Sequence, residues 1–109
     1  MSLVSPGKQS NNHKLYFSKS EISKILNFYA IGVSKGEWKD YALDFNSNEA
    51  IFCFYKHAWA TPDCKLSKLK VKREKRIIFK LSITNKKNSK YDNLDSLIAS
   101  LKRQQITLI

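Results

Sequence analysis

The chain has 109 residues, 42% of them hydrophobic, and a formal net charge of +11. This length suits one domain with one modest core, and the hydrophobic fraction is that of a globular chain rather than a disordered one. The apolar runs are far shorter than the about 20 residues of a membrane-spanning helix. No hydrophobic segment precedes Leu15, so we expect neither a membrane anchor nor a secretion signal. The two cysteines, Cys53 and Cys64, are then expected to be reduced thiols of a cytoplasmic protein.

The first predicted element is a helix over about residues 19–35. Ser18 is a natural N-cap, Glu21 completes a capping box three residues later, and Gly36 provides a stop. Apolar residues recur at spacings of three and four, which is typical of a helix with one buried face. That predicted face consists of Ile22, Ile25, Leu26, Tyr29 and Val33, widened by Phe28 and Ile31.

Four strands are predicted next, over residues 41–45, 50–55, 66–71 and 77–83. The first and last alternate apolar and polar residues, the pattern of a half-buried strand. The second is apolar on both faces and is predicted to be central in the sheet. Turn chemistry at residues 46–48 separates the first two strands, and residues 72–75 form the predicted turn of a lysine-rich hairpin.

A polar loop is predicted over residues 84–90, followed by a second helix that Asp92 or Asn93 caps. The apolar residues 106–109 are predicted to form a last short strand or packing segment. These elements predict an α+β fold, an antiparallel sheet of about four strands flanked by an N-terminal and a C-terminal helix. Residues 1–14 are predicted to be a disordered tail, and residues 15–109 a single α+β domain.

The positive charge is concentrated in one part of the chain. The stretch from Lys65 to Lys90 contains eleven basic residues and one acidic residue, Glu74. It therefore carries a net charge of +10, and the rest of the chain carries +1. A focused positive field attracts polyanions such as nucleic acids. Only three of the 20 basic residues are arginines, which argues against base-specific reading but not against phosphate binding. AT-rich codon usage is a competing explanation for the lysine excess.

The leading hypothesis is therefore a non-enzymatic protein that binds DNA or RNA through phosphate contacts on the hairpin. Each cation of the hairpin would contact a phosphate, and the candidate set is Lys68, Lys70, Lys72, Arg73, Lys75, Arg76 and Lys80. No aromatic stacking platform accompanies them, so a merely solubilising surface explains the charge about as well. The alternative function is an interaction or regulatory adaptor that binds an acidic protein or forms a homodimer.

Trp38 and Tyr41 could line a ligand pocket, but an aromatic residue just after a helix stop more often packs over the core, so we expect a structural role for them. Three other groups of residues are candidates for sites of chemistry. The carboxylates Glu37, Asp40 and Asp44 have no accompanying histidine or glycine-rich turn, so we interpret them as a solvated strand face. The cluster Cys53, His57, Asp63 and Cys64 matches no standard zinc spacing. Three glycines in the whole chain leave no phosphate-cradling motif. We expect no enzyme activity, no metal and no cofactor.

The segment from Gly36 to Phe45, GEWKDYALDF, carries a resemblance to a known family when taken with Phe17, Glu21 and Tyr29 upstream. It resembles a family of short uncharacterised proteins, known mainly from alphaproteobacteria and classed as a domain of unknown function. The resemblance is good over about residues 15–56, whereas the basic hairpin and the last helix match only loosely. It implies a bacterial cytoplasmic protein and carries over no activity, cofactor or site residue.

Overall fold

The computed structural model describes residues 14–57 and 61–108, with side chains as far as Gln104. The predicted disordered tail, apart from Lys14, lies outside the described residues. The elements in chain order are α2 (Lys19–Ser34), β1 (Asp40–Phe45), β2 (Glu49–Tyr55), β3 (Cys64–Val71), β4 (Arg76–Ile83), β5 (Ser89–Tyr91) and α3 (Leu94–Leu108).

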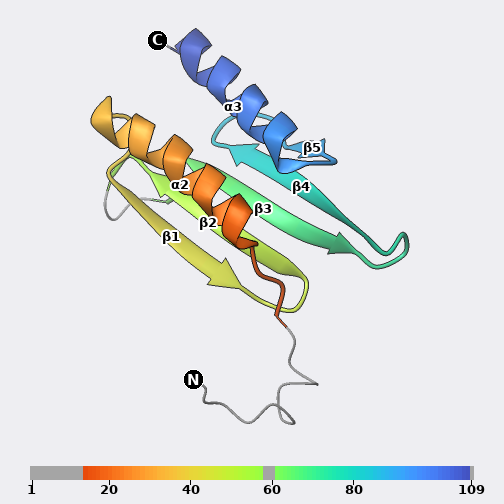
Figure 1. The fold of residues 1–109 in the computed structure, drawn as a ribbon. Coiled ribbons are helices and arrows are strands. Elements are labelled where there is room, and N and C mark those ends of the chain that lie inside the picture. Colours follow the sequence, from red (N-terminus) through yellow and green to blue (C-terminus); the bar gives the residue numbers. More distant parts are fainter. Residues whose placement is uncertain (1–13, 58–60, 109) are drawn as a thin grey trace, which may run out of the picture.

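The strands form one antiparallel sheet in the order β1-β2-β3-β4-β5, so every strand pairs with its neighbour in sequence. Both helices pack side by side on one face of this sheet and run in the same direction (Figure 1). The other face, called here the open face, carries no helix. The α+β fold with an N-terminal and a C-terminal helix is therefore confirmed.

The core fills the space between the helices and the sheet, and period-two alternation decides which side chains enter it. Phe52 and Phe54 of β2 point to the helices and are fully buried. The register places Phe52 between Leu43 of β1 and Leu66 of β3, and Leu66 opposite Leu81 of β4. This ladder of apolar side chains continues across the sheet, and β2 is an interior strand as predicted.

Helix α2 begins as predicted, because Ser18 and Glu21 form a capping box. The Glu21 carboxylate accepts from the Ser18 amide (2.7 Å), and the Ser18 hydroxyl accepts from the Glu21 amide (3.1 Å). The buried face was predicted too broadly. Leu26, Ile31 and Val33 were assigned to it but remain 36%, 45% and 44% exposed, because the helix presents only one narrow side to the sheet.

The joint between α2 and β1 depends on Trp38, which is 5% exposed and meets the Phe54 ring edge-on at a centroid distance of 5.1 Å. Its indole lies directly over Gly32 of α2, where an added Cβ would come within 2.1 Å of Trp38 Cδ1. Gly36 ends the turn after α2 with a positive φ of 78°. The predicted packing role of Trp38 is confirmed.

Two predictions near the C-terminus are wrong. The predicted loop over residues 84–90 contains the start of β5, which pairs with β4 and makes the sheet five-stranded. Residues 106–108 continue α3, so the strand expected there is wrong. The alternative of a packing segment stays a prediction, because side chains are described only as far as Gln104. The cap of α3 is confirmed at Asn93, whose Oδ1 accepts from the Ser96 amide (2.8 Å). Neither described helix has the length and apolar character needed to cross a membrane.

Candidate nucleic-acid interface

Strands β3 and β4 form the hairpin that the charge pattern singled out. They pair over eight positions, from Cys64 opposite Ile83 to Val71 opposite Arg76. The four turn residues that follow β3 are all exposed, and Lys75 closes the turn with a positive φ of 49°. The hairpin extends past the first turns of both helices, so its tip projects from the body of the protein (Figure 1).

The register distributes the predicted cations over two faces of the sheet. Lys68 lies opposite Phe79 and Lys70 opposite Ile77, which places both on the side of the helices. Lys80 and Arg76 lie on the open face. The predicted cations therefore do not share one face of the hairpin, because the pairing with β4 puts Lys68 and Lys70 in phase with core residues.

Lys68 is engaged in holding the fold together. Its Nζ lies 2.8 Å from Glu21 Oε1 and donates to the Tyr16 carbonyl (3.0 Å), and its side chain is only 13% exposed. Burial raises the pKa of Glu21, but the hydrogen bonds and the charge from Lys68, together with the cap at Ser18, outweigh burial and hold that pKa below its usual value. Lys68 thus ties β3 to the start of α2 and is not available to a phosphate.

Arg76 is also neutralised within the chain. Its Nε lies 2.6 Å from Glu74 Oε1 and its Nη1 lies 2.8 Å from Asp92 Oδ1. Glu74 belongs to the hairpin turn, whereas Asp92 comes just before α3. Arg76 therefore links these two segments, although its exposure leaves the pair open to competition from other anions.

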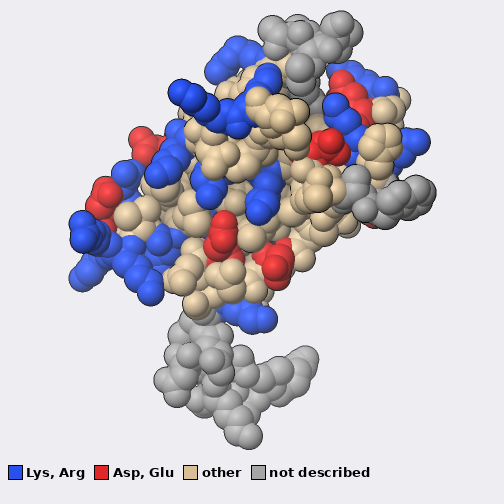
Figure 2. All heavy atoms as spheres, turned by 180° about the vertical axis from the view of Figure 1, so that it is seen from behind, with Lys and Arg blue, Asp and Glu red and all other residues tan. Residues whose placement is uncertain are grey.

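The remaining five predicted cations form no ion pair among the described residues. One of them, Lys80, lies on the open face of the sheet, where two further lysines join it. Lys80 lies directly opposite Lys90 of β5, so their Cβ atoms are about 5 Å apart. Lys65, opposite Ser82, is the diagonal neighbour of Lys80 at about 7–8 Å. Figure 2 views this face and shows basic side chains across its middle and at the hairpin end.

We call the set Lys65, Lys72, Arg73, Lys75, Lys80 and Lys90 the basic surface. Sequence reasoning missed Lys90 because residues 84–90 were predicted to be a loop. It missed Lys65 because the strand was predicted to begin at Leu66, whereas β3 begins at Cys64. Like charges placed directly opposite each other across two strands destabilise a sheet, so Lys80 and Lys90 cost the fold some stability.

The carboxylates Asp40 and Asp44 lie on the open face of β1, as their even spacing predicted. The Asn46 amide donates to the Glu49 carbonyl (2.9 Å). Because positions that bond to the neighbouring strand alternate with positions that do not, the amides of Tyr41, Leu43 and Phe45 point away from β2 toward the free edge. Asp40 Oδ1 accepts from the Tyr41 amide (2.8 Å) and Asp44 Oδ1 from the Phe45 amide (2.9 Å). Both carboxylates therefore cover donors of an edge strand that would otherwise be open to pairing.

The cysteines do not form a common site. Cys53 lies opposite Lys65 on the open face, whereas Cys64 lies opposite Phe54 on the side of the helices. Burial raises the pKa of Cys64 to about 12 and also raises that of Cys53, so both thiols stay protonated near neutral pH. Among the described residues, no group of three or more His, Cys, Asp or Glu side chains is placed to hold a metal.

The fold and the interface define a small two-layer α+β protein, a meander sheet covered by two helices and carrying a basic hairpin. The model of the family described as "Protein of unknown function (DUF2794)" matches residues 15–94, and the chain belongs to this family. The match runs from the segment before α2 to the first residue of α3, well beyond the 15–56 over which the resemblance was expected. No curated protein and no solved structure matches the chain.

Proposed function

We propose that the protein binds DNA or RNA through phosphate contacts of the basic surface, without reading base sequence. The observation that carries this proposal is the group Lys65, Lys80 and Lys90 on three neighbouring strands. Within the part of the chain that the structure describes, these lysines form no ion pair although acidic residues lie elsewhere on the same face. Neighbouring lysines repel each other and weaken a sheet, so we expect them to be placed side by side where a bound anion offsets this repulsion.

The side chains favour the sugar-phosphate backbone over the bases. A lysine ammonium is a compact charge that contacts a phosphate oxygen without demanding a fixed orientation. Tyr55 is the one described aromatic residue on the open face, so stacked bases would find little support there. Binding should therefore weaken steeply with salt and depend little on base sequence.

The test is fluorescence anisotropy with labelled single-stranded and double-stranded DNA and RNA at two salt concentrations. The variant Lys65→Gln/Lys80→Gln/Lys90→Gln should bind at least about tenfold more weakly, and the slope of log affinity against log salt should fall by about one for each lysine that contacts a phosphate. The control Lys35→Gln/Lys39→Gln/Lys102→Gln removes the same charge elsewhere and should bind almost normally. Equal losses in both variants, or no binding by the wild type, would refute the proposal.

An acidic protein partner is the second candidate. Ile51 and Leu69 are partly exposed beside the cations on the open face and would suit a partner that offers both carboxylates and apolar side chains. Competition distinguishes the two candidates. If the surface recognises phosphates, poly-glutamate should displace a bound oligonucleotide poorly. If the surface recognises only diffuse negative charge, poly-glutamate should compete as well as an unlabelled oligonucleotide does.

A further inference from the structure

The large apolar side chains that remain exposed among the described residues concentrate on one side of the protein. Six are more than a third exposed, and five of them lie along β1 and the neighbouring flank of α2: Tyr16, Leu26, Val33, Tyr41 and Leu43. We call these five the apolar step. The sixth, Ile31, is seven residues from Lys24, so it shares the opposite flank of α2 with this lysine, which pairs with Asp95 of α3 at 2.9 Å.

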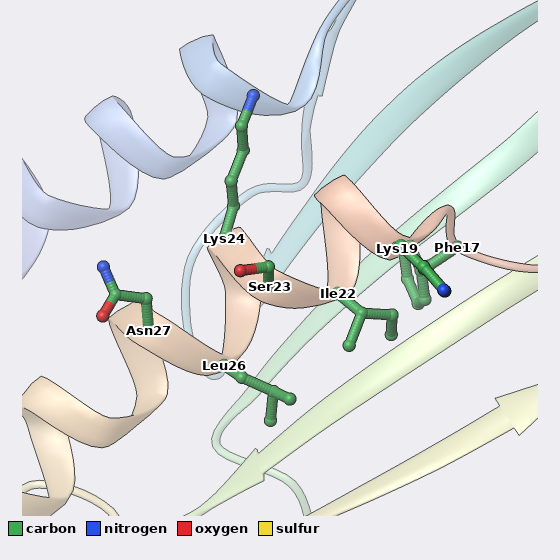
Figure 3. A pocket seen from close by; sticks show the side chains of 7 residues that line it. All are labelled: Phe17, Lys19, Ile22, Ser23, Lys24, Leu26 and Asn27. Atoms are coloured by element: carbon green, nitrogen blue, oxygen red, sulfur yellow. The ribbon is translucent and has the colours of Figure 1, made fainter.

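The apolar step has two parts, one flank of α2 and the side of β1 next to it. Leu26 and Val33 are seven residues apart and line the flank of α2 next to Tyr29, whose ring contacts Tyr41 of β1 at 5.0 Å. Strand β1 is an edge strand of the sheet, and no other strand of the described residues pairs beyond it. Figure 3 shows Ile22 and Leu26 projecting from α2 away from α3, whereas Lys24 points to α3.

The first half of α2 borders an open hollow of about 780 Å³. Its lining is Phe17, Lys19, Ile22, Ser23, Lys24, Leu26 and Asn27 (Figure 3).

The two borders of the apolar step carry opposite charges. Lys19 is seven residues before Leu26, so it continues the same flank of α2, and it forms no ion pair among the described residues. Asp40 and Asp44 belong to the open face of β1, but their carboxylates reach its outer edge, where they accept from the Tyr41 and Phe45 amides. Antiparallel α2 and β1 bring the start of the helix near the end of the strand, as the contact between Tyr16 and Phe45 (4.8 Å) indicates. An apolar surface with one basic border and one acidic border is complementary to itself.

We propose that the apolar step binds a second copy of this chain, around a two-fold axis that runs along the step. In this arrangement α2 of each copy lies over β1 of the other. Leu26 then packs against Leu43 of the partner subunit, and Lys19 pairs with Asp44 of the partner subunit. A two-fold contact of this kind uses the same patch on both copies.

Pairing of the two β1 edges is the competing arrangement, and the charges argue against it. Two antiparallel copies of β1 that pair around Ala42, the middle of the strand, would set Asp40 opposite Asp44 of the partner subunit, and like charges at such positions repel. The hydrogen bonds from the Tyr41 and Phe45 amides to these carboxylates also occupy donors that edge pairing would need. The exposed apolar area is on the order of 400 Å² per copy, which is below the size of stable interfaces, so the expected dimer is weak.

Sedimentation equilibrium of the full chain from micromolar to millimolar concentration tests the proposal. The wild type should change from monomer to dimer in this range, whereas Leu43→Glu should stay monomeric with an unchanged circular dichroism spectrum. Ile31→Glu is the matched control, because Ile31 is as exposed as Leu43 but lies on the other flank of α2. A wild type that is monomeric throughout, or a dimer that survives Leu43→Glu, overturns the proposal and leaves the apolar step to a different partner.

Charge substitutions separate the two dimer arrangements. Asp44→Asn keeps the side-chain oxygen but removes the charge, so it should weaken the proposed dimer several-fold, whereas it would strengthen edge pairing. Lys19→Glu should also weaken the dimer. Lys19→Glu/Asp44→Lys should restore most of the affinity, and failure of this double variant to exceed either single variant would overturn the pairing of Lys19 with Asp44.

Discussion

At the scale of single residues, lysines that look alike in the sequence do different things. Lys68 holds β3 to α2, whereas Lys80 projects from the open face. The residues around Lys68 explain why sequence alone could not separate the two roles. Leu66 is in phase with Lys68, but Leu69 and Val71 have the opposite phase, so the strand gives no consistent apolar face. The cap at Ser18 was predictable because it depends on residues three apart, whereas the phase of Lys68 depends on pairing with β4.

We therefore expect Lys68→Met to lower the free energy of unfolding by about 1–2 kcal/mol, because it leaves a half-buried carboxylate without its cation. Lys80→Met, at a partly exposed position that forms no ion pair among the described residues, should change it by less than about 0.5 kcal/mol. Urea unfolding monitored by circular dichroism measures both. Equal effects of the two substitutions would show that Lys68 has no special structural role.

The same ion pair makes stability depend on pH in a defined direction. The pKa of Glu21 is lower in the folded protein than its usual value of 4.5, so the carboxylate stabilises the fold above that value. This contribution is lost as the pH falls through the lowered pKa. The difference in unfolding free energy between the wild type and Glu21→Gln should therefore be largest near neutral pH and shrink below pH 4.5. A difference that stays constant on acidification would contradict the role of Glu21.

At the scale of elements, the α2–β1 joint was only half predictable. The sequence indicated that Gly36 ends α2 and that Trp38 packs on the core, both from local patterns. It did not indicate that Gly32 is the site where Trp38 packs, because that contact depends on how the chain returns after the turn. Strand β5 was missed for a related reason, since three residues show no alternation and only pairing with β4 defines them.

The joint gives an unusual prediction for Gly32. A glycine-to-alanine change inside a helix normally adds about 0.5–1 kcal/mol of stability. Gly32→Ala should instead lower stability by about 1–3 kcal/mol, because the new methyl group overlaps Trp38 and forces the indole to move. Gly36→Ala meets no atom within 4 Å and should show only the cost of its positive φ, about 1–2 kcal/mol. Tryptophan fluorescence during unfolding reports both, and a shifted native emission is expected for Gly32→Ala alone.

The edge strand gives a second prediction at this scale. Asp40→Leu/Asp44→Leu uncovers two amide donors of β1 and removes both charges, so it should promote strand pairing and aggregates larger than a dimer. Asp40→Asn/Asp44→Asn keeps oxygen acceptors and should aggregate much less. Light scattering and thioflavin fluorescence over time compare the two. If both double variants stay clear, the carboxylates do not protect the edge.

At the scale of the whole molecule, the two proposed surfaces lie on opposite layers. The apolar step belongs to the helix layer and its edge, whereas most of the basic surface belongs to the open face. A two-fold axis along the step turns one sheet over relative to the other, so the open faces of the two copies point in opposite directions. A dimer of this form would bind two separate nucleic acid molecules rather than one molecule more tightly.

This geometry predicts bridging. When donor-labelled and acceptor-labelled duplexes are mixed, the wild type should produce energy transfer between them at concentrations where the dimer forms. Leu43→Glu should still raise the anisotropy of each duplex but produce no energy transfer, since monomers carry one basic surface each. Lys65→Gln/Lys80→Gln/Lys90→Gln should lose both signals. Full energy transfer with Leu43→Glu would mean that single copies or non-specific aggregates bring the duplexes together, and the apolar step would then have no part in it.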